Sequence, residues 1–326
     1  MLNELNSSIT LLEYYLSWLI KLSSGSIASY ILIMFFMLLV VLELNSPREK
    51  LSINQVQSSY LSNIKLFVFN SLIISLLSIP SLLLLASHYA DKGLLNTISN
   101  PIEKIVISFL AMDLMLYCLH KACHHFDCLW MLHKVHHNDS YLNVTTAFRL
   151  HFLEILLIIS MKALLVLVLG IEQTWLLANE AIIAFFTMLH HSNIVLLAEE
   201  LFGWIIITPY LHRAHHSILR NEHDRNYGAV LSLWDRLFRT LAELKPMGIG
   251  VEGYVSQDFI DLISCGLTIK DKAPSIQTAN LDHMIAEAAY YKAEKRNFNP
   301  GNELQDWLDA KREIIGYIYR MKQVIK

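Results

Sequence analysis

The sequence predicts an all-α protein: a polytopic bundle of membrane helices with a histidine-rich cap at the cytoplasmic face and a small C-terminal helical hairpin. Hydrophobic residues make up 54% of the 326 residues and charged residues only 17%, whereas an average soluble domain carries about 25% charged residues. Several apolar runs approach the length of a membrane span. Fifteen histidines are present, and most of them gather in short clusters that follow apolar runs.

Two apolar runs meet the requirement of ~20 mostly apolar residues for crossing ~30 Å of hydrocarbon. They are residues 27–44 and residues 66–86, and the second contains Pro80, a plausible kink. Three weaker runs are interrupted by charge: 105–119 contains Asp113, 153–171 contains Lys162 and 174–189 contains Glu180. Because only a few residues around Glu172 separate the last two runs, they are expected to form a tight helical hairpin.

Two further apolar stretches are too short or too polar to span. Residues 201–211 (LFGWIIITPYL) predict an interfacial or re-entrant piece, and residues 11–22 (LLEYYLSWLIKL) predict an amphipathic helix at the membrane surface.

The distribution of basic residues sets the orientation. The segment 45–65 carries Arg48, Lys50 and Lys65 and is therefore expected in the cytoplasm. Counting spans from there, the runs ending near residues 119 and 189 both return to the cytoplasmic side. The histidines that follow each run should consequently meet at one face of an inner membrane.

The histidines have helical spacings. His120 and His124 form an HxxxH pair, and two HxxHH boxes contain His133, His136 and His137, and His212, His215 and His216. Residues three or four apart share one face of a helix, and neutral imidazole is the commonest metal ligand in proteins. These spacings predict a metal site built from several helices, to which His190 or His191 can add.

The number of histidines indicates more than one ion. Eight or nine imidazoles exceed what one ion can use, whereas two six-coordinate ions offer about twelve positions, leaving some for oxygen or water. The HExxH arrangement of metalloproteases is absent. Imidazole suits iron, zinc, copper or nickel, so ligand type alone does not separate iron from zinc.

The order of these boxes resembles the fatty acid hydroxylase superfamily, also called the sterol desaturase family, whose members are integral-membrane di-iron oxygenases. The resemblance covers residues 100–245 and rests on six elements in the family's order: DLMLYCLHKACHH, LWMLHKVHHND, FRLHFLE, MLHHSNI, TPYLHRAHHS and NYGAVLSLWDRLFRT. The last element departs from the family at Arg239, where glycine is common.

The resemblance implies a ligand set and its supports. The implied metal ligands are His120, His124, His133, His136, His137, His212, His215 and His216, with His191 as the ninth and His190 as its competitor. Orienting roles are implied for Arg149, His151 and Glu154, which could equally form a salt-bridged start to a span. Asn226 and Asp235 either orient histidines or cap local structure. Asp113 is either a support of the histidines or a buried polar tie.

The function implied by the resemblance is hydroxylation of an unactivated C–H bond of a lipid by O2 at two iron ions. Electrons must come from an external reductase, ferredoxin or cytochrome, since the chain has no dinucleotide fingerprint and no CxxC motif. A desaturase or an ether-lipid monooxygenase would use the same centre. A metal-binding or transport protein is the alternative of another class. The net charge of −3 gives no indication of a nucleic-acid partner.

The chain divides into four expected parts: N-terminal spans over 1–99, a catalytic domain over 100–245, a connecting segment over 246–275 and a helical module over 276–326. The last part is polar, and Asn299-Pro300-Gly301 separates its two helical stretches. It resembles a short bacterial module of uncharacterised function.

The span count predicts opposite sides of the membrane for residues 88–104 and for the histidine boxes. Single cysteines introduced near residue 95 and near residue 140 should react with a membrane-impermeant thiol reagent from the periplasmic and the cytoplasmic side, respectively. Labelling of both positions from one side would contradict the span count.

Overall fold

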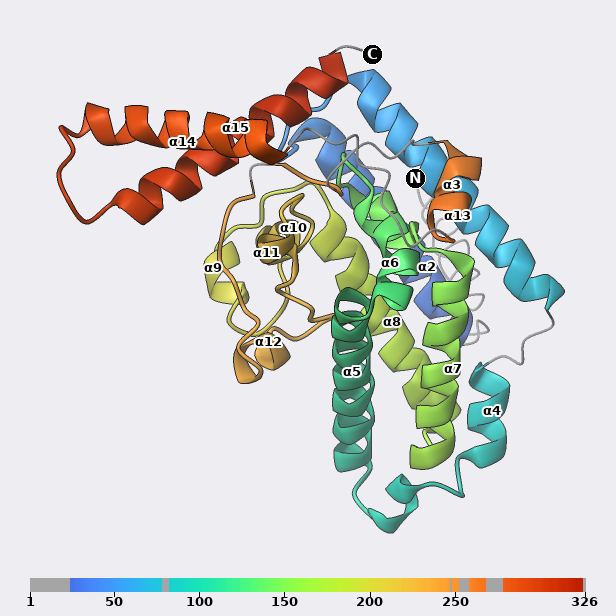
Figure 1. The fold of residues 1–326 in the computed structure, drawn as a ribbon. Helices are drawn as coiled ribbons and strands as arrows, with labels where there is room; N and C mark the ends of the chain where they lie inside the picture. The colour runs from blue at the N-terminus through green and yellow to red at the C-terminus, as the bar shows by residue number, and fades with distance from the viewer. Residues whose placement is uncertain (1–23, 78–81, 247, 252–257, 268–277, 325–326) are drawn as a thin grey trace, which may run out of the picture.

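The computed structural model describes residues 24–77, 82–246, 248–251, 258–267 and 278–324 (Figure 1). Within these residues the regular elements are helices, and strand pairing is limited to two isolated bridges, Ile206 with Leu231 and Ser217 with Ile249. The prediction of an all-α fold is confirmed.

Seven α-helices build the bundle and its inner cap: α2 (Ser24–Asn45), α3 (Ile53–Leu76), α4 (Leu82–Tyr89), α5 (Pro101–His125), α6 (Asp127–His137), α7 (Phe152–Leu169) and α8 (Gln173–His191). Short helices follow: α9 (Glu199–Phe202), α10 (Pro209–His215), α11 (Arg220–His223), α12 (Leu233–Leu237) and α13 (Phe259–Cys265). Two 3₁₀ helices, Leu94–Thr97 and Val144–Phe148, connect longer elements.

Three of the described helices, α2, α3 and α7, are long and apolar enough to cross a membrane. Helix α2 exposes Ile31, Met34 and Leu38 at 59%, 71% and 52%, which in water would be costly but suits contact with lipid. The predicted spans 105–119 and 174–189 lie within α5 and α8, and α5 packs against both α7 and α8 (Figure 1).

The bounds predicted for the second span, residues 66–86, were wrong. Helix α3 already begins at Ile53, where Ser52 and Gln55 form a capping box, and it ends at Leu76 before the separate helix α4. Asn63 and Asn70 lower the hydropathy of α3 but are buried against the protein. The basic segment before it is therefore shorter than predicted, and Lys65 lies within the helix. Pro80 lies outside the described residues, as does the stretch 11–22.

The turn between α7 and α8 matches the predicted helical hairpin. Helix α7 ends at Gly170, whose φ of 68° is left-handed, and α8 begins three residues later at Gln173. A Cβ at Gly170 would lie 2.6 Å from the backbone nitrogen of Gly93. Glycine is required here because both the backbone conformation and the close approach exclude a side chain.

Buried polar side chains tie the first two helices to the histidine-rich region. The Glu43 carboxylate of α2 accepts hydrogen bonds from the backbone N–H groups of Val144 and Asn193 at 2.7 and 2.6 Å. In α3, Ser59 and Asn63 donate to the Asp139 carboxylate at 2.9 Å. These bonds hold α2 and α3 against the loop that follows α6.

The predicted interfacial piece 201–211 is divided in the structure. Its start completes α9, and its end forms the first turn of α10, with Pro209 at the first helical position and Thr208 as the N-cap. Between them, Ile207 donates its backbone N–H to the carbonyl of Val230 at 2.9 Å. The segment is thus held by the protein at its centre.

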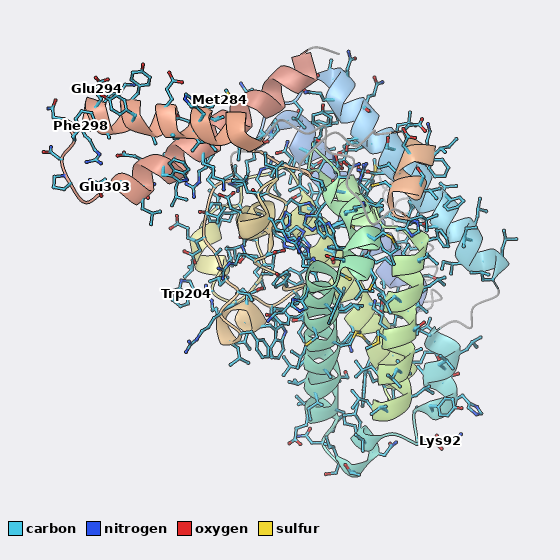
Figure 2. All side chains as sticks on the ribbon, in the orientation of Figure 1. Lys92, Trp204, Met284, Glu294, Phe298 and Glu303 are labelled. Atoms are coloured by element: carbon cyan, nitrogen blue, oxygen red, sulfur yellow. The ribbon has the colours of Figure 1, made fainter. Side chains whose placement is uncertain are left out.

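The C-terminal hairpin consists of α14 (Thr278–Lys295) and α15 (Glu303–Val324), which pack together. Ion pairs join Lys292 to Glu313 and Arg296 to Asp306, each at 2.6 Å. The hairpin lies at the end of the molecule opposite Lys92, and its turn around Phe298 projects away from the bundle (Figure 2). The prediction of a small C-terminal helical hairpin is confirmed.

Arg239 adopts a left-handed backbone conformation with φ of 58°, at the position where the resembling family commonly has glycine. A left-handed L-residue costs roughly 1–2 kcal/mol. We therefore expect Arg239→Gly to raise the free energy of unfolding by about 1 kcal/mol. Arg239→Ala removes the same exposed side chain without relieving the strain and serves as the control. Thermal unfolding in detergent measures both, and equal stability of the two variants would contradict the expectation.

Candidate metal centre

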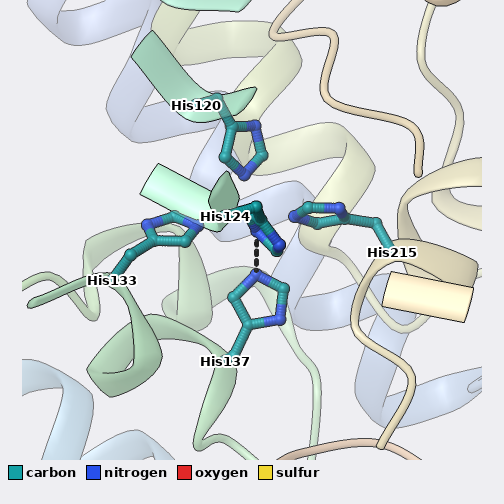
Figure 3. Close-up of side chains that lie close together, drawn as sticks. All are labelled: His120, His124, His133, His137 and His215. Carbon is teal, nitrogen blue, oxygen red and sulfur yellow. Dashed lines mark hydrogen bonds between the residues drawn. The ribbon is translucent and has the colours of Figure 1, made fainter. Parts of the chain in front are cut away.

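The nine histidines predicted as ligands lie in two groups of converging side chains. One, called here the five-histidine group, contains His120, His124, His133, His137 and His215 (Figure 3). The other, the four-histidine group, contains His136, His191, His212 and His216. In each group one nitrogen of every imidazole lies within 4.8 Å of the others.

Helical spacing explains how each HxxHH box serves both groups. In α6, His133 and His137 are four residues apart and join the five-histidine group, while His136 turns to the four-histidine group. At α10 the division is reversed, since His212 and His216 join the four-histidine group and His215 the other. Positions i and i+4 share a face, and i+3 points to its edge, so one helix reaches two adjacent centres.

Six of the nine imidazoles make an outward contact through Nδ1. Backbone carbonyls or carboxylates are the partners in each case: Tyr227 O for His120, Asp224 for His124, Glu154 for His133, Arg149 O for His136, Thr187 O for His191 and Arg225 O for His215, at 2.6–3.2 Å. These acceptors place the proton on Nδ1 and leave the Nε2 lone pair pointing inward. The same arrangement orients histidine ligands in metalloproteins.

The four-histidine group supplies a direct test of whether a metal fits. The Nε2 atoms of His136 and His191 are 3.0 Å apart, and those of His191 and His212 are 2.9 Å apart. Since His136 and His191 both donate from Nδ1 to carbonyls, two lone pairs face each other without a proton between them. Two nitrogens that bind one ion at about 2.1 Å and at right angles are about 3 Å apart. A cation between them removes the repulsion, so the residues fit a metal ion.

The five-histidine group passes a similar test. The Nε2 atoms of His120, His133 and His215 are buried and have no hydrogen-bond partner. Figure 3 shows the five rings facing a common centre, with the ring of His120 4.4 Å from that of His215 and 4.8 Å from that of His133. Buried nitrogens without partners are rare in proteins, and a metal ion would satisfy all of them.

Burial keeps the imidazoles of His136, His137 and His216 neutral. Burial lowers the pKa of His136, His137 and His216 well below the ordinary value of 6.5, and neighbouring imidazoles lower it further. The free lone pairs needed for metal binding are consequently present at neutral pH.

Arg149 and Glu154 support the α6 histidines. The fully buried Arg149 guanidinium donates to the carbonyl of Val135 and to Asn63 Oδ1, both at 2.9 Å, which places the Arg149 carbonyl for His136. Glu154 accepts from His133 Nδ1 at 2.6 Å. His151 instead caps α7, since its Nδ1 accepts the N–H of Leu153 at 3.3 Å.

Asp235 supports His120 indirectly, through the backbone of Tyr227 and Gly228. Its carboxylate accepts the N–H groups of Tyr227 and Gly228, both at 2.8 Å, and so fixes the segment whose Tyr227 carbonyl orients His120. Asn226 donates to the carbonyl of Leu211 at 2.8 Å and thereby holds α10.

Asp113 of α5 binds the segment from Val230 to Trp234. Its carboxylate accepts the backbone N–H groups of Val230 and Leu231 at 2.9 and 3.1 Å, and the indole N–H of Trp234 at 2.8 Å. It joins α5 to this loop as a buried polar tie.

His190 and His191 occupy different places. His191 belongs to the four-histidine group, whereas the ring of His190 lies 4.0 Å from that of His212 without joining either group. His190 lines an apolar cavity beside the two groups, which is described below. His125, which follows the HxxxH pair, is exposed and outside both groups.

The sequence patterns missed two residues beside the five-histidine group. Asp224 contacts His124 Nδ1 at 3.1 Å, and the buried His223 stacks on Trp130 with ring centroids 5.0 Å apart. His223 lies outside any box spacing, but Asp224 immediately precedes the Arg-Asn-Tyr-Gly segment, a position that could have marked it. Glu222, next to them, accepts from Ser217 at 2.7 Å and from Arg312 of α15 at 3.3 Å.

An apolar cavity of about 250 Å³, called here the histidine cavity, borders both groups. Its lining includes five histidines of these groups, His120, His133, His136, His191 and His212, together with Leu116, Ile158, Ile183 and Thr187. The arrangement places metal-ligand chemistry directly beside a space suited to an aliphatic chain.

We compared the sequence with models of known protein families. Residues 105–240 match the family model described as fatty acid hydroxylase. A second match, over residues 280–315, is to a family described only as protein of unknown function (DUF2934). It coincides with the C-terminal hairpin.

Curated relatives match part of the chain. The ornithine lipid hydroxylase OlsE of Rhizobium tropici is 29% identical over 201 residues, covering 60% of each chain. Alkylglycerol monooxygenases are 33% identical over 150 residues in Danio rerio, covering 42% of this chain and 30% of the relative, and 31% identical over 133 residues in Caenorhabditis elegans, covering 39% and 25%. The chain thus spans at most about 60% of these relatives' lengths. No solved structure matches.

Alanine substitutions should separate clustered from unclustered histidines. His136→Ala and His215→Ala should each lose bound metal, because each removes one inward Nε2 and loosens the remaining imidazoles of its group. His125→Ala should retain wild-type metal content. Metal analysis of the purified proteins by mass spectrometry measures all three. Full metal content in both clustered variants would show that neither group binds the metal.

Proposed function

We propose that the protein is a membrane-bound di-iron oxygenase that hydroxylates an unactivated C–H bond of a lipid. The observation that carries the proposal is the position of nine histidines in two groups, five of which line an apolar cavity. The overall reaction consumes O2, two electrons and two protons, and yields the alcohol and water. The relatives named as a lipid hydroxylase and as alkylglycerol monooxygenases support the assignment.

The proposed ligands are the members of the two groups, with one ion in each. Two bound iron ions would supply the oxygen and electron chemistry that no side chain of this chain provides. The five and four imidazoles leave positions open in six-coordinate ions, which is what a catalytic centre needs. Zinc binds the same ligand type, so metal analysis of protein from iron-fed and zinc-fed cells tests the identity.

The chain's own residues orient the imidazoles and exclude water from the site. Glu154, Arg149 and Asp235 hold the imidazoles through the contacts described above, directly or through backbone carbonyls. The aliphatic lining of the histidine cavity excludes water from the reacting C–H bond. A lipid entering from the bilayer reaches the cavity between helices without passing through solvent.

The proposed orientation places the histidine groups and the C-terminus in the cytoplasm of a bacterial cell. Arg48, in the basic segment after α2, donates to the carbonyl of Ile194 at 3.0 Å and pairs with Glu199, so this segment lies beside the four-histidine group. The bond from Arg312 to Glu222 puts the hairpin on the same side. External electrons from a reductase, ferredoxin or cytochrome would then be available there.

Two related activities would leave different products. A desaturase removes two hydrogens without adding oxygen, and an ether-lipid monooxygenase yields an aldehyde and a lipid lacking the ether chain. Metal transport would change cellular metal without changing lipids. Transport sites place ligands at mid-membrane, whereas the histidines of α5 and α8 lie in the last two turns of these helices.

Comparison of the lipids of expressing and deletion strains grown under heavy-isotope O2 tests the proposal. Expressing cells should contain a lipid heavier by one labelled oxygen, which is missing from the deletion strain and from cells producing His136→Ala. His125→Ala should restore it. An unchanged lipid profile combined with altered cellular metal would reject the oxygenase in favour of the transporter.

A further inference from the structure

A second cavity adjoins the histidine cavity. This lateral cavity, about 750 Å³, lies between α3, α7 and α8, with apolar walls that include Phe67, Ile74, Phe148 and Ile159. Ala147, Leu150, Ile158 and Lys162 line both cavities. A lipid chain can therefore extend from the lateral cavity to the histidine groups.

Two charged residues line this mostly apolar space. Lys162 of α7 donates to Glu180 of α8 at 2.7 Å, and Lys162 is only 8% exposed. Both belong to the wall of the lateral cavity. Ionisable residues within membrane helices are costly and are retained chiefly where they have a function.

Two oxygens in the same wall are buried without a hydrogen-bond partner. One is Glu180 Oε1, the carboxylate oxygen that Lys162 does not bind. The other is Asn70 Oδ1, on α3. Asn70 is 3% exposed, and its NH2 group donates to the carbonyl of Leu150 at 2.8 Å, which fixes the amide so that Oδ1 is the unsatisfied atom.

A purely structural ion pair does not account for these oxygens. A pair that only joined α7 to α8 would gain from having both carboxylate oxygens satisfied, and it would not require an unsatisfied amide oxygen on a third helix. Two unsatisfied acceptors, one on α3 and one on α8, line one cavity and can accept hydrogen bonds from a ligand. Because Lys162 already balances the charge of Glu180, the favoured donor is uncharged.

We propose that Asn70, Lys162 and Glu180 form a polar subsite for an uncharged hydrogen-bond donor, an amide N–H or a hydroxyl, carried by the chain of the lipid substrate. The proposal rests on the lipid-oxygenase function proposed above and specifies its substrate class. Lys162 has three donors, so an amide could also present its carbonyl to the ammonium group.

The subsite also sets a distance. Lys162 follows Glu154, the partner of His133, by eight residues on α7, which corresponds to about 12 Å along the helix axis. The donor on the substrate and the oxidised carbon should be separated by about that length. A plain hydrocarbon chain would leave the subsite unsatisfied.

Binding of two matched amphiphiles to the purified full-length protein in nanodiscs tests the subsite without requiring turnover. N-ethyl hexadecanamide and ethyl hexadecanoate differ by one N–H, and radiolabel retention gives their affinities. The wild type should prefer the amide roughly tenfold, the value of one hydrogen bond to a charged acceptor. A hydroxylated ethyl hexadecanoate shows whether a hydroxyl serves as well as an amide.

The matched variant is Lys162→Met/Glu180→Met, which exchanges the ion pair for apolar groups of similar size, a change that buried pairs commonly tolerate. Its preference for the amide should fall below about threefold. Glu172→Met, at the exposed start of α8, should keep the full preference. Equal binding of amide and ester by the wild type would overturn the subsite, as would a folded double variant with unchanged preference.

The outcomes separate this subsite from the proposed function. Amide preference without any oxidised lipid in cells would leave the subsite standing and reject the oxygenase. Oxidised lipid in cells with no amide preference would support the oxygenase and reject the subsite.

Discussion

The structure depends on bringing nine imidazole nitrogens to two points inside an apolar protein. Neutral imidazoles whose lone pairs face each other at about 3 Å repel, as His136 and His191 do, and a bound cation would offset this repulsion. The polar residues around the groups serve that end. Each Nδ1 contact fixes a ring before binding, so that little conformational entropy is lost when the metal binds.

The contacts that support the histidines differ between the two sides of the site. On the α6 and α7 side, Glu154 contacts His133 directly and Arg149 positions His136 through its own carbonyl. On the α10 side, Asp235 acts through the backbone of Tyr227. Backbone carbonyls recur because they orient an imidazole without adding charge to a buried site. The negative charge of Glu154 would be balanced by a metal cation on its histidine partner.

The elements outside the family region connect to the same centre. Glu43 of α2 accepts the backbone N–H groups of Val144 and Asn193. Arg312 of α15 pairs with Glu222, which accepts from Ser217 beside His216. The Arg312 bond pairs a carboxylate that is 3% exposed, so loss of the hairpin would leave a buried charge next to the four-histidine group. The hairpin contributes no member of either histidine group. Through Arg312 and Glu222 it supports Ser217, the residue that follows His216.

The sequence by itself determined what local geometry controls. Spacings of three and four residues place His133, His136 and His137 along one side of a helix in any context, and the apolar runs require helices in a membrane. It misjudged α3, because hydropathy averages cannot distinguish lipid from a protein interior that pairs Asn63 with Asp139. Tertiary structure alone decided the division of each box between two groups, the separate places of His190 and His191, and Asp113 as a tie to Trp234. These outcomes depend on contacts between residues far apart in the chain, which no local pattern encodes.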